Sequence, residues 1–370
     1  MTLLRLEPRG EASRAMVYLT PLIAVALTLV SGFLLFWAMG FDPVKALHAF
    51  FIEPVSSVRG VGELAVKATP LVLCAIGLAI GFRANVWNIG AEGQLTLGAI
   101  VGGGIALAFY GEGGWWLLPL MIVGGMVGGA LWAAIPAFLR IRFNASEILT
   151  SLMLNYVAMH LLNYLMHGPY RDPEGFAFPE SRLFEADAVM PLLVAGTRVH
   201  LGSLFALLAV AGGWFLMART FIGFQIKVIG LTPIAAGYAG FKQTRIIWLT
   251  LLLSGALAGL AGLGEVAGPI GQLNPTISPG YGYTAIIVAF LGRLHPVGIL
   301  LAGFLMALSF IGGEAAQIAL GLPKAITGVF QGMLLFFLLA TDVLIRYRLR
   351  FGAKSGSGTA PKPIAGRAAA

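Results

Sequence analysis

Residues 64–110 read LAVKATPLVLCAIGLAIGFRANVWNIGAEGQLTLGAIVGGGIALAFY, and this stretch decides the fold class. Two apolar runs, 64–82 and 93–110, enclose a short polar segment. Each run is about as long as a helix that crosses the hydrocarbon layer of a bilayer. The sequence therefore predicts two membrane-spanning helices joined by a tight connection that carries amides and charges.

The composition agrees with a protein that lies mostly in a bilayer. The chain has 370 residues, of which 58% are hydrophobic and only 11% are charged. A soluble domain carries roughly 25% charged residues, so a water-soluble fold of this size would lack the charge to cover its surface. The composition excludes an ordinary cytosolic enzyme, a nucleic-acid-binding protein and a disordered scaffold. We expect membrane lipid around the chain and no nucleic acid bound to it.

Eight further apolar runs extend the same pattern. They cover residues 17–39, 116–139, 147–166, 200–217, 246–266, 281–292, 296–311 and 324–345. The first is too long for the apolar core of a signal peptide, so we expect it to be retained as a span. The 281–292 run is short, and it either enters at an angle or forms a broken pair with the next run. We predict an all-α fold, a polytopic membrane helical bundle of about ten transmembrane helices.

The positive charges indicate the orientation of the bundle. If the N-terminus is cytoplasmic, the inside segments hold 17 Lys and Arg residues and the outside segments hold 5. Cytoplasmic segments of membrane proteins collect positive charge. We therefore expect both termini in the cytoplasm and an even number of spans. The net charge of +8 has the same topological explanation.

The expected layout has three parts. A cytoplasmic segment at 1–16 precedes a transmembrane domain at 17–345, and a basic, disordered tail follows at 346–370. Within the transmembrane domain, the loop 167–199 holds five acids against three bases. We expect it to be an ordered external loop that contacts an extracytoplasmic partner. The loop 218–245 is basic and contains no acid, which places it in the cytoplasm.

Glycines recur at a spacing of four within the apolar runs, as at Gly125 and Gly129 and at Gly255 and Gly259. This spacing puts small residues on one helix face and lets helices approach closely. We favour tight packing within one subunit over a dimer face.

The polar segment between the first two runs carries Asn85, Asn88, Glu92 and Gln94 into apolar surroundings. Polar groups at membrane depth cost several kcal/mol each if unpaired, and they persist where they pair or line a wet path. Glycines beside them weaken the helix, and a broken helix exposes backbone groups to a translocated solute. The alternative is an ordinary cytoplasmic turn in which Arg83 pairs with Glu92.

A second polar stretch, NASEILTSLMLNY, covers residues 144–156. Ser146 is suited to cap the next helix, with Glu147 in its first turn. Asn155 and Tyr156 then fall in mid-span. An intramembrane Asn needs a partner and either meets the solute or makes an interhelical hydrogen bond.

The basic inside loop contains a helix signal. Pro233 is suited to the first position of a helix, and Gly240 is suited to close it. A short helix between two spans, with basic flanks, can transmit force from a soluble partner. The alternative is a mere connection, although more than twenty residues is long for that role.

Three of these stretches carry a family resemblance: FRANVWNIGAEGQLTLGA at 82–99, ASEILTSLMLNYVA at 145–158 and RTFIGFQIKVIGLTPIAAGYAG at 219–240. With ELAVKATPLVL at 63–73 and IIVAFLGRLHPVG at 286–298, the similarity runs through most of residues 60–340. The chain resembles the permease subunit of bacterial ABC importers in the ribose and branched-chain amino acid group. Within that group it is most similar to the nucleoside and simple-sugar type, which pairs with a basic-membrane-protein-like binding lipoprotein.

The resemblance implies two sets of functional residues. The first would couple the chain to a separate ATPase: Arg219, Gly223, Phe224, Lys227, Gly230, Ala235, Ala236, Tyr238 and Gly240. Ile234 departs from the family pattern, in which a charged or polar residue is common there. The second would line or support the substrate pathway: Asn85, Trp87, Asn88, Glu92, Gln94, Asn155 and Tyr156.

The resemblance also implies partners and a location. It predicts cytoplasmic ATPase subunits, a second permease subunit (homologous or identical), and an extracytoplasmic substrate-binding lipoprotein. The transported solute would be a small neutral polar molecule, a nucleoside or a simple sugar. The chain would be a multi-pass protein of the bacterial plasma (inner) membrane.

The sequence weighs against a motor or a catalytic centre in this chain. It has no G-x-x-x-x-G-K-[ST] phosphate loop, so ATP and Mg²⁺ are expected on the partner ATPase, with no cofactor held here. An ion-coupled secondary transporter or channel is the alternative, but its candidates, Glu92, Glu265 and Glu314, lie near the ends of the expected spans. A membrane enzyme would need clustered His, Asp or Glu, and the sparse charges predict neither catalytic residues nor a metal site.

Overall fold

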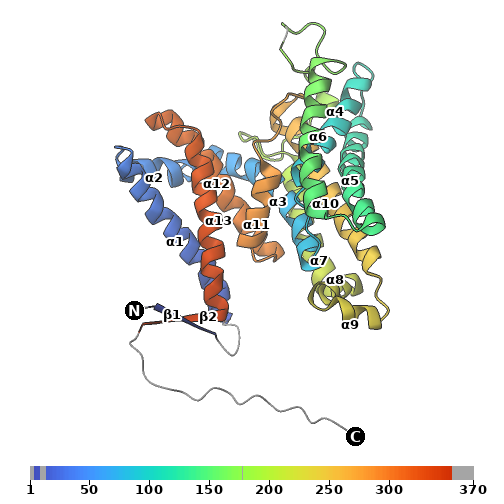
Figure 1. The fold of residues 1–370 in the computed structure, drawn as a ribbon. Coiled ribbons are helices and arrows are strands. Elements are labelled where there is room, and N and C mark those ends of the chain that lie inside the picture. The colour runs from blue at the N-terminus through green and yellow to red at the C-terminus, as the bar shows by residue number, and fades with distance from the viewer. Residues whose placement is uncertain (1–3, 9–13, 177, 352–370) are drawn as a thin grey trace.

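The structure is a computed structural model, and it describes residues 4–8, 14–176 and 178–351. Helices dominate this part of the chain (Figure 1). The α-helices are α1 Arg14–Ala38, α2 Pro43–Phe51, α3 Val58–Arg83, α4 Ala91–Ala108, α5 Leu117–Phe143, α6 Glu147–His167, α7 Leu201–Arg219, α8 Phe221–Leu231, α9 Pro233–Tyr238, α10 Gln243–Glu265, α11 Tyr281–Leu291, α12 Pro296–Leu320 and α13 Ala325–Arg346. Two 3₁₀ turns, η1 Glu53–Val55 and η2 Ala186–Ala188, and a π-helix, η3 Val266–Ile270, complete the helical elements, and strands β1 Leu4–Pro8 and β2 Tyr347–Phe351 form one ribbon.

Nine helices in the described ranges are long and apolar enough to cross a membrane. The tenth expected span, at 281–292, is instead the short helix α11 of 11 residues. At 1.5 Å per residue it covers about 16 Å, roughly half of the hydrocarbon layer. It does not form a broken pair with α12, because α12 has 25 residues and is long enough to cross a membrane by itself. The described part of the bundle therefore has nine helices of spanning length, and a half-length helix stands in place of the tenth.

The tightest part of the bundle is the crossing of α4, α5 and α10, where glycines replace side chains. A Cβ on Gly98 would meet the backbone of Gly259, and one on Gly129 would meet the backbone of Gly255. Direct approach of helix backbones is what small residues at membrane helix interfaces allow. The expected packing within one subunit is thus present at these glycines.

The two described ends of the chain meet at one end of the bundle. Strands β1 and β2 pair antiparallel, with Leu4 opposite Phe351 and Pro8 opposite Tyr347. Figure 1 shows this ribbon at the same end of the bundle as α8 and α9. The prediction of a disordered tail at 346–370 is therefore wrong for residues 347–351, which pair with the N-terminal strand. The rest of that tail lies outside the described residues.

Two helix starts follow the local sequence signals. Ser146 caps α6 by accepting a hydrogen bond from the Leu149 amide at 3.5 Å, and Glu147 lies in the first turn. Pro233 occupies the first turn of α9, and Gly240 follows its end with a φ of +79°. Both signals depend on neighbouring residues only, which is why the sequence alone could show them.

Backbone hydrogen bonds hold the described residues of the loop 167–199 against the bundle. Its backbone runs along the segment that follows α10, where amides of Ser181, Phe184 and Met190 donate to carbonyls of Leu273, Gly271 and Ala267 at 2.7–3.0 Å. The loop lies at the end of the bundle opposite α8 and α9. It therefore covers the outer end of α10.

Helices α1, α2, α12 and α13 form a second packing group at the side of the bundle (Figure 1). Its core contains Phe36, Phe50 and Phe330, whose rings lie 4.7–5.5 Å apart. Arg293, in the turn before α12, bonds Asp342 of α13 and Thr20 of α1. These contacts fix the outermost helices to the turn that ends α11.

Candidate functional site

The polar segment between α3 and α4 is closed by a network of buried amides. Asn88 is 1% exposed and donates to Gln94 at 2.9 Å and to Ser254 of α10 at 3.0 Å. Its side-chain oxygen accepts from the Gly90 amide at 2.9 Å and from Gln94 at 3.0 Å. These bonds satisfy Asn88 within the protein, so it braces the start of α4 against α10.

Asn155 of α6 braces the same segment from the other side. It accepts from the Gly93 amide at 2.9 Å and donates to the carbonyl of Ile89 at 2.9 Å and to the Tyr283 hydroxyl at 3.0 Å. Asn155 is 5% exposed, whereas its neighbour Tyr156 is 52% exposed. Successive residues of a helix point about 100° apart, so the two side chains lie on different faces. The structure therefore brings Asn155 into the cluster and leaves Tyr156 on the outer surface.

Glu92 connects this cluster to the half-length helix. Its carboxylate accepts the backbone amide of Gly282 at 2.6 Å, in the first turn of α11. A carboxylate is favourable there because the first amides of a helix lack partners and carry partial positive charge. The alternative pairing of Arg83 with Glu92 is not formed. The sequence alone indicates Glu92 as a charged residue in apolar surroundings. It does not indicate the partner of Glu92, because Gly282 lies 190 residues further along the chain.

Asn85 and Trp87 lie at the edge of the cluster. Asn85 has a φ of +56°, and its side chain accepts from the Trp87 indole at 3.1 Å. The Trp87 ring packs against Phe82 and Phe290, with centroids 5.0 and 6.0 Å away. Its backbone amide donates to Glu147, which also pairs with Arg140. The seven expected pathway residues thus fall into three groups. Asn88, Glu92, Gln94 and Asn155 support the cluster, Asn85 and Trp87 lie at its edge, and Tyr156 is exposed.

A polar chain that the sequence analysis missed lies at the outer end of the bundle. Lys67 of α3 donates to the Tyr281 hydroxyl at 2.9 Å, and that hydroxyl donates to the buried carboxylate of Glu265 at 3.3 Å. Lys67 also lies 3.9 Å from Glu314 of α12. From the sequence, Glu265 and Glu314 could be located only near the ends of the expected spans, because no short-range pattern indicates that they pair with Lys67.

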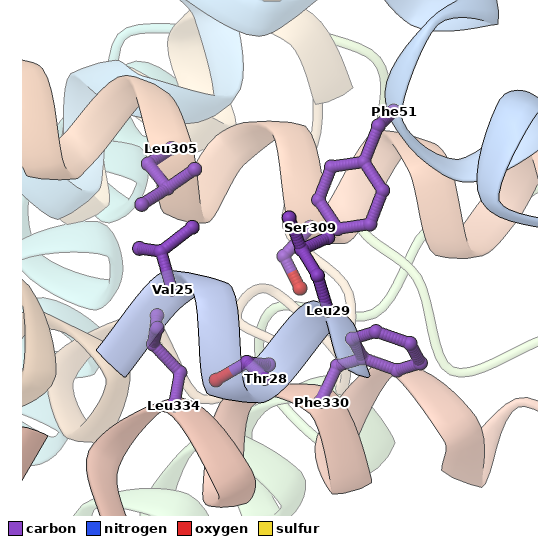
Figure 2. A pocket seen from close by; sticks show the side chains of 8 residues that line it. All are labelled: Val25, Thr28, Leu29, Phe51, Leu305, Ser309, Phe330 and Leu334. Carbon is purple, nitrogen blue, oxygen red and sulfur yellow. The ribbon is translucent and has the colours of Figure 1, made fainter. Parts of the chain in front are cut away.

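These residues line a cavity of about 420 Å³ between α3, the 270–281 segment, α12 and α13. A second, smaller cavity of about 30 Å³ lies between α1, α12 and α13 (Figure 2). Figure 2 shows that its walls are apolar apart from Thr28 and Ser309. A cavity of that size holds a water molecule or two but no sugar. The larger one has the size of ordinary small-molecule sites.

The loop 218–245 forms an elbow, defined here as α8, α9 and the residues on either side of them. Thr220 caps α8 by accepting from the Gly223 amide at 3.1 Å, and Arg219 stacks over Trp214. Gly223, Ile226 and Ile229 are buried against the bundle. This buried face orients the opposite face of α8 outward.

The outward face of the elbow is apolar and basic. Phe224, Leu231, Ile234 and Tyr238 are all more than half exposed, and Tyr238 reaches 91%. Lys227 is exposed between them, and the segment has no acid. Contiguous exposed apolar residues of this kind mark interaction sites. Ile234, the residue that departs from the family pattern, is part of this surface.

Other expected coupling residues face the bundle. A Cβ on Gly230 would meet the carbonyl of Arg83, at the end of α3, and Ala236 is 1% exposed. Ala235 is exposed, and Gly240 provides the positive φ that ends α9. Gly223, Gly230 and Ala236 therefore shape the elbow, while Phe224, Lys227 and Tyr238 present its surface.

Two titratable groups outside the spans have shifted pKa values. A hydrogen bond from Arg198 to Glu63 raises the pKa of the Arg198 guanidinium. Burial lowers the pKa of His200 to about 4, so the imidazole stays neutral at physiological pH. Its Nδ1 accepts the Gly202 amide at 3.1 Å, which caps α7. Both groups anchor the outer loop to the bundle.

Comparison with known proteins agrees with this geometry. Residues 60–339 match the family described as branched-chain amino acid transport system / permease component. The chain is 36% identical to the glucose ABC transporter permease protein of Haloferax volcanii, over 98% of each chain. It is 31% identical to the guanosine ABC transporter permease protein of Bacillus subtilis, over 92% of this chain and 97% of that one. It is 30% identical to a nucleoside ABC transporter permease protein of Lactococcus lactis, over 88% and 92% of the two chains.

The family match, the long apolar helices and the exposed basic elbow all indicate a membrane permease. The ion-coupled transporter and the membrane enzyme are set aside, because members of this family are permease components and the ATPase is a separate subunit. Such a permease works with ATPase partners and a substrate-binding protein. This chain belongs to the branched-chain amino acid transport system / permease component family, as a multi-pass membrane permease subunit of an ABC transporter.

Proposed function

We propose that this chain and a second permease subunit, homologous or identical, form the import path for a small neutral polar solute, a nucleoside or a simple sugar. An extracytoplasmic binding lipoprotein would deliver the solute, and two cytoplasmic ATPase subunits would bind ATP and Mg²⁺. Relatives whose names specify glucose, guanosine and nucleosides support this substrate range. All of these solutes are uncharged and rich in hydroxyl groups.

The observation that carries the proposal is the exposed face of the elbow. Its apolar side chains lie at the end of the bundle that holds the β1–β2 ribbon, and the excess of Lys and Arg predicts that this end is cytoplasmic. A surface of this kind gains free energy when a partner groove covers it. The basic charge favours a groove that carries acidic residues, and closure of the two ATPases on ATP would move the elbow and reorient the spans.

The buried cluster around Asn88, Glu92 and Asn155 has a supporting role in this proposal. Its amides are satisfied by each other and by backbone groups, so they hold the broken segment in shape beside the route. The elbow touches this segment through Gly230 and the carbonyl of Arg83. Movement of the elbow would therefore reach the cluster through direct contacts.

The test replaces Tyr238 with Ala in the assembled transporter. Tyr238 is exposed, so the change leaves the bundle intact while it removes the largest side chain of the elbow surface. We expect about a tenfold or greater loss of ATPase bound to the membrane subunits, and a matching loss of guanosine or glucose uptake. The matched control is Trp115→Ala, because Trp115 is 88% exposed at the outer end of the bundle. Wild-type ATPase binding by the Tyr238 variant would contradict the proposed docking.

A further inference from the structure

The cavity of about 420 Å³ has a closed floor and an open mouth. The buried side chains of Tyr281 and Glu265 form the floor. Glu314 and Lys324 lie at the mouth, where both are exposed. The mouth is at the outer end of α12 and α13, opposite the elbow. The cavity therefore opens at the end of the bundle that lies away from the elbow.

The cavity is lined by groups of both signs. Lys67 and Lys324 carry two positive charges, and Glu265 and Glu314 offer two carboxyl groups. A cavity lined by both kinds of group is not built for ions of one sign only. It offers donors and acceptors close together, which suits a neutral molecule with several hydroxyl groups. Phe310 adds an apolar wall against which a sugar ring or a base can pack.

Two residues of the cavity lining keep unused donors. Gln331 lines this cavity, and its Nε2 is covered by the protein without a hydrogen-bond partner. A buried donor without a partner costs free energy, and this amide would meet a bound hydroxyl oxygen only after the Gln331 side chain turns toward the cavity. Lys67 also retains donor capacity, because its ammonium has three protons and its hydrogen bond to Tyr281 uses one.

The floor of the cavity is mechanically connected to the polar cluster. Tyr281 is the first residue of α11, and the next amide, of Gly282, donates to Glu92. A group that pulls on Lys67 or Tyr281 therefore acts on the N-terminus of the half-length helix.

We propose that this outer cavity is a binding site for the hydroxyl groups of a sugar or of the ribose of a nucleoside, with Lys67 as its central donor and Glu314 as a further partner. This inference rests on the proposed function, because it names the place where that solute is received. It adds a specific site within this chain, distinct from the cluster at residues 85–94.

The test measures binding directly by protection of an introduced thiol. Thr276→Cys places a reactive thiol on an exposed position of the cavity lining. The natural Cys74 is 1% exposed, so the wild-type chain gives the background of labelling by a membrane-impermeant maleimide. In the complete transporter in proteoliposomes, we expect guanosine or D-glucose to slow labelling of Thr276→Cys about fivefold or more at saturating concentration.

Variants then assign the protection to named residues. Adding Lys67→Met or Glu314→Leu to Thr276→Cys should raise the concentration for half-maximal protection about tenfold or more. Glu314 is exposed, so its replacement should not disturb folding even if Lys67→Met does. The matched control, Lys45→Met, removes an exposed lysine of α2 and should leave protection unchanged.

The outcomes separate the two proposals. Import of guanosine or glucose without any protection of Thr276→Cys, or with protection that neither variant weakens, would overturn this site while the proposed function stands. Failure of the wild-type transporter to import any member of a panel of nucleosides and simple sugars would overturn the proposed function and the inference that rests on it. Protection that both variants weaken, with the control unchanged, would support the site.

Discussion

At the scale of single residues, the buried amides show why polar groups persist at membrane depth. Asn88 and Asn155 use both the donor and the acceptor of their side chains, and each contacts a backbone group of the 89–93 segment. Each side chain thus replaces a hydrogen bond that the broken helix has lost. Their burial argues for support of the backbone, and the exposed position of Tyr156 removes it from that role.

His200 makes stability depend on pH. Its pKa is lowered from 6.5 to about 4 by burial, so between these values the unfolded chain binds a proton that the folded chain excludes. The folded state therefore loses stability as pH falls through this window, by about 2 kcal/mol at pH 5. We expect the thermal midpoint of the detergent-solubilised protein to fall between pH 7.5 and pH 5.

His200→Asn should remove most of that pH dependence, because Asn can cap α7 through its side-chain oxygen but does not titrate. The measurement compares thermal midpoints at the two pH values for wild type, His200→Asn and the control His48→Asn. His48 is exposed on α2, so its variant should respond to pH as the wild type does. An unchanged pH response in His200→Asn would show that another group controls acid stability.

At the scale of elements, the glycines of α10 decide how closely three helices pack. A Cβ on Gly259 would meet backbone atoms of Gly125 and Gly129 in α5, whereas one on Gly264 would meet nothing within 4 Å. We expect Gly259→Ala to destabilise the bundle by about 1–3 kcal/mol, because backbone must move. Gly264→Ala should be neutral or stabilising by up to about 1 kcal/mol, because Ala is the better helix former.

The comparison uses thermal stability and the yield of folded protein for the two variants in the same helix. Equal thermal stability of the two variants would mean that helix propensity, and not the close approach of α5, determines the effect of the substitution. The glycine spacing could be read from the sequence because it is local to each run. The partner of each glycine could not, since Gly98 and Gly259 meet only after 160 intervening residues have folded.

The half-length helix α11 marks the limit of prediction from the sequence. Its apolar run was visible, and so was its short length. What the sequence did not show is that Glu92 supplies the missing partner at its N-terminus, or that Tyr281 bonds Lys67 across 214 positions. Caps such as Ser146 depend on the next three residues, whereas these contacts depend on the packing of distant helices. For the same reason the outer cavity was missed.

At the scale of the whole molecule, a continuous series of contacts joins the elbow to the outer cavity. Gly230 of the elbow packs on the end of α3, and the segment that follows α3 leads to Glu92. Glu92 holds the start of α11, where Tyr281 closes the floor of the cavity. Packed interiors respond to strain by shifting between discrete arrangements. Work done at the elbow thus has a physical route to the outer cavity.

The pairing of β1 with β2 requires an even number of membrane crossings, and this yields a topology prediction. The two strands can pair only if both ends of the chain lie on the same side of the membrane. The nine full-length helices of the described ranges are an odd number, so α11 and the 271–280 segment before it must together provide a tenth crossing. Residues before α10 and after α11 should then share a side.

Labelling of single introduced cysteines tests this prediction, with the buried Cys74 as a silent background. Lys227→Cys in the elbow and His295→Cys after α11 should react with an impermeant maleimide only when the cytoplasmic face is open to the reagent. Glu174→Cys in the outer loop and Thr276→Cys before α11 should react from the outside. Labelling of His295→Cys and Thr276→Cys from the same side would mean that α11 does not complete a crossing. The chain would then have nine crossings, its ends would lie on opposite faces, and the β1–β2 ribbon could not form.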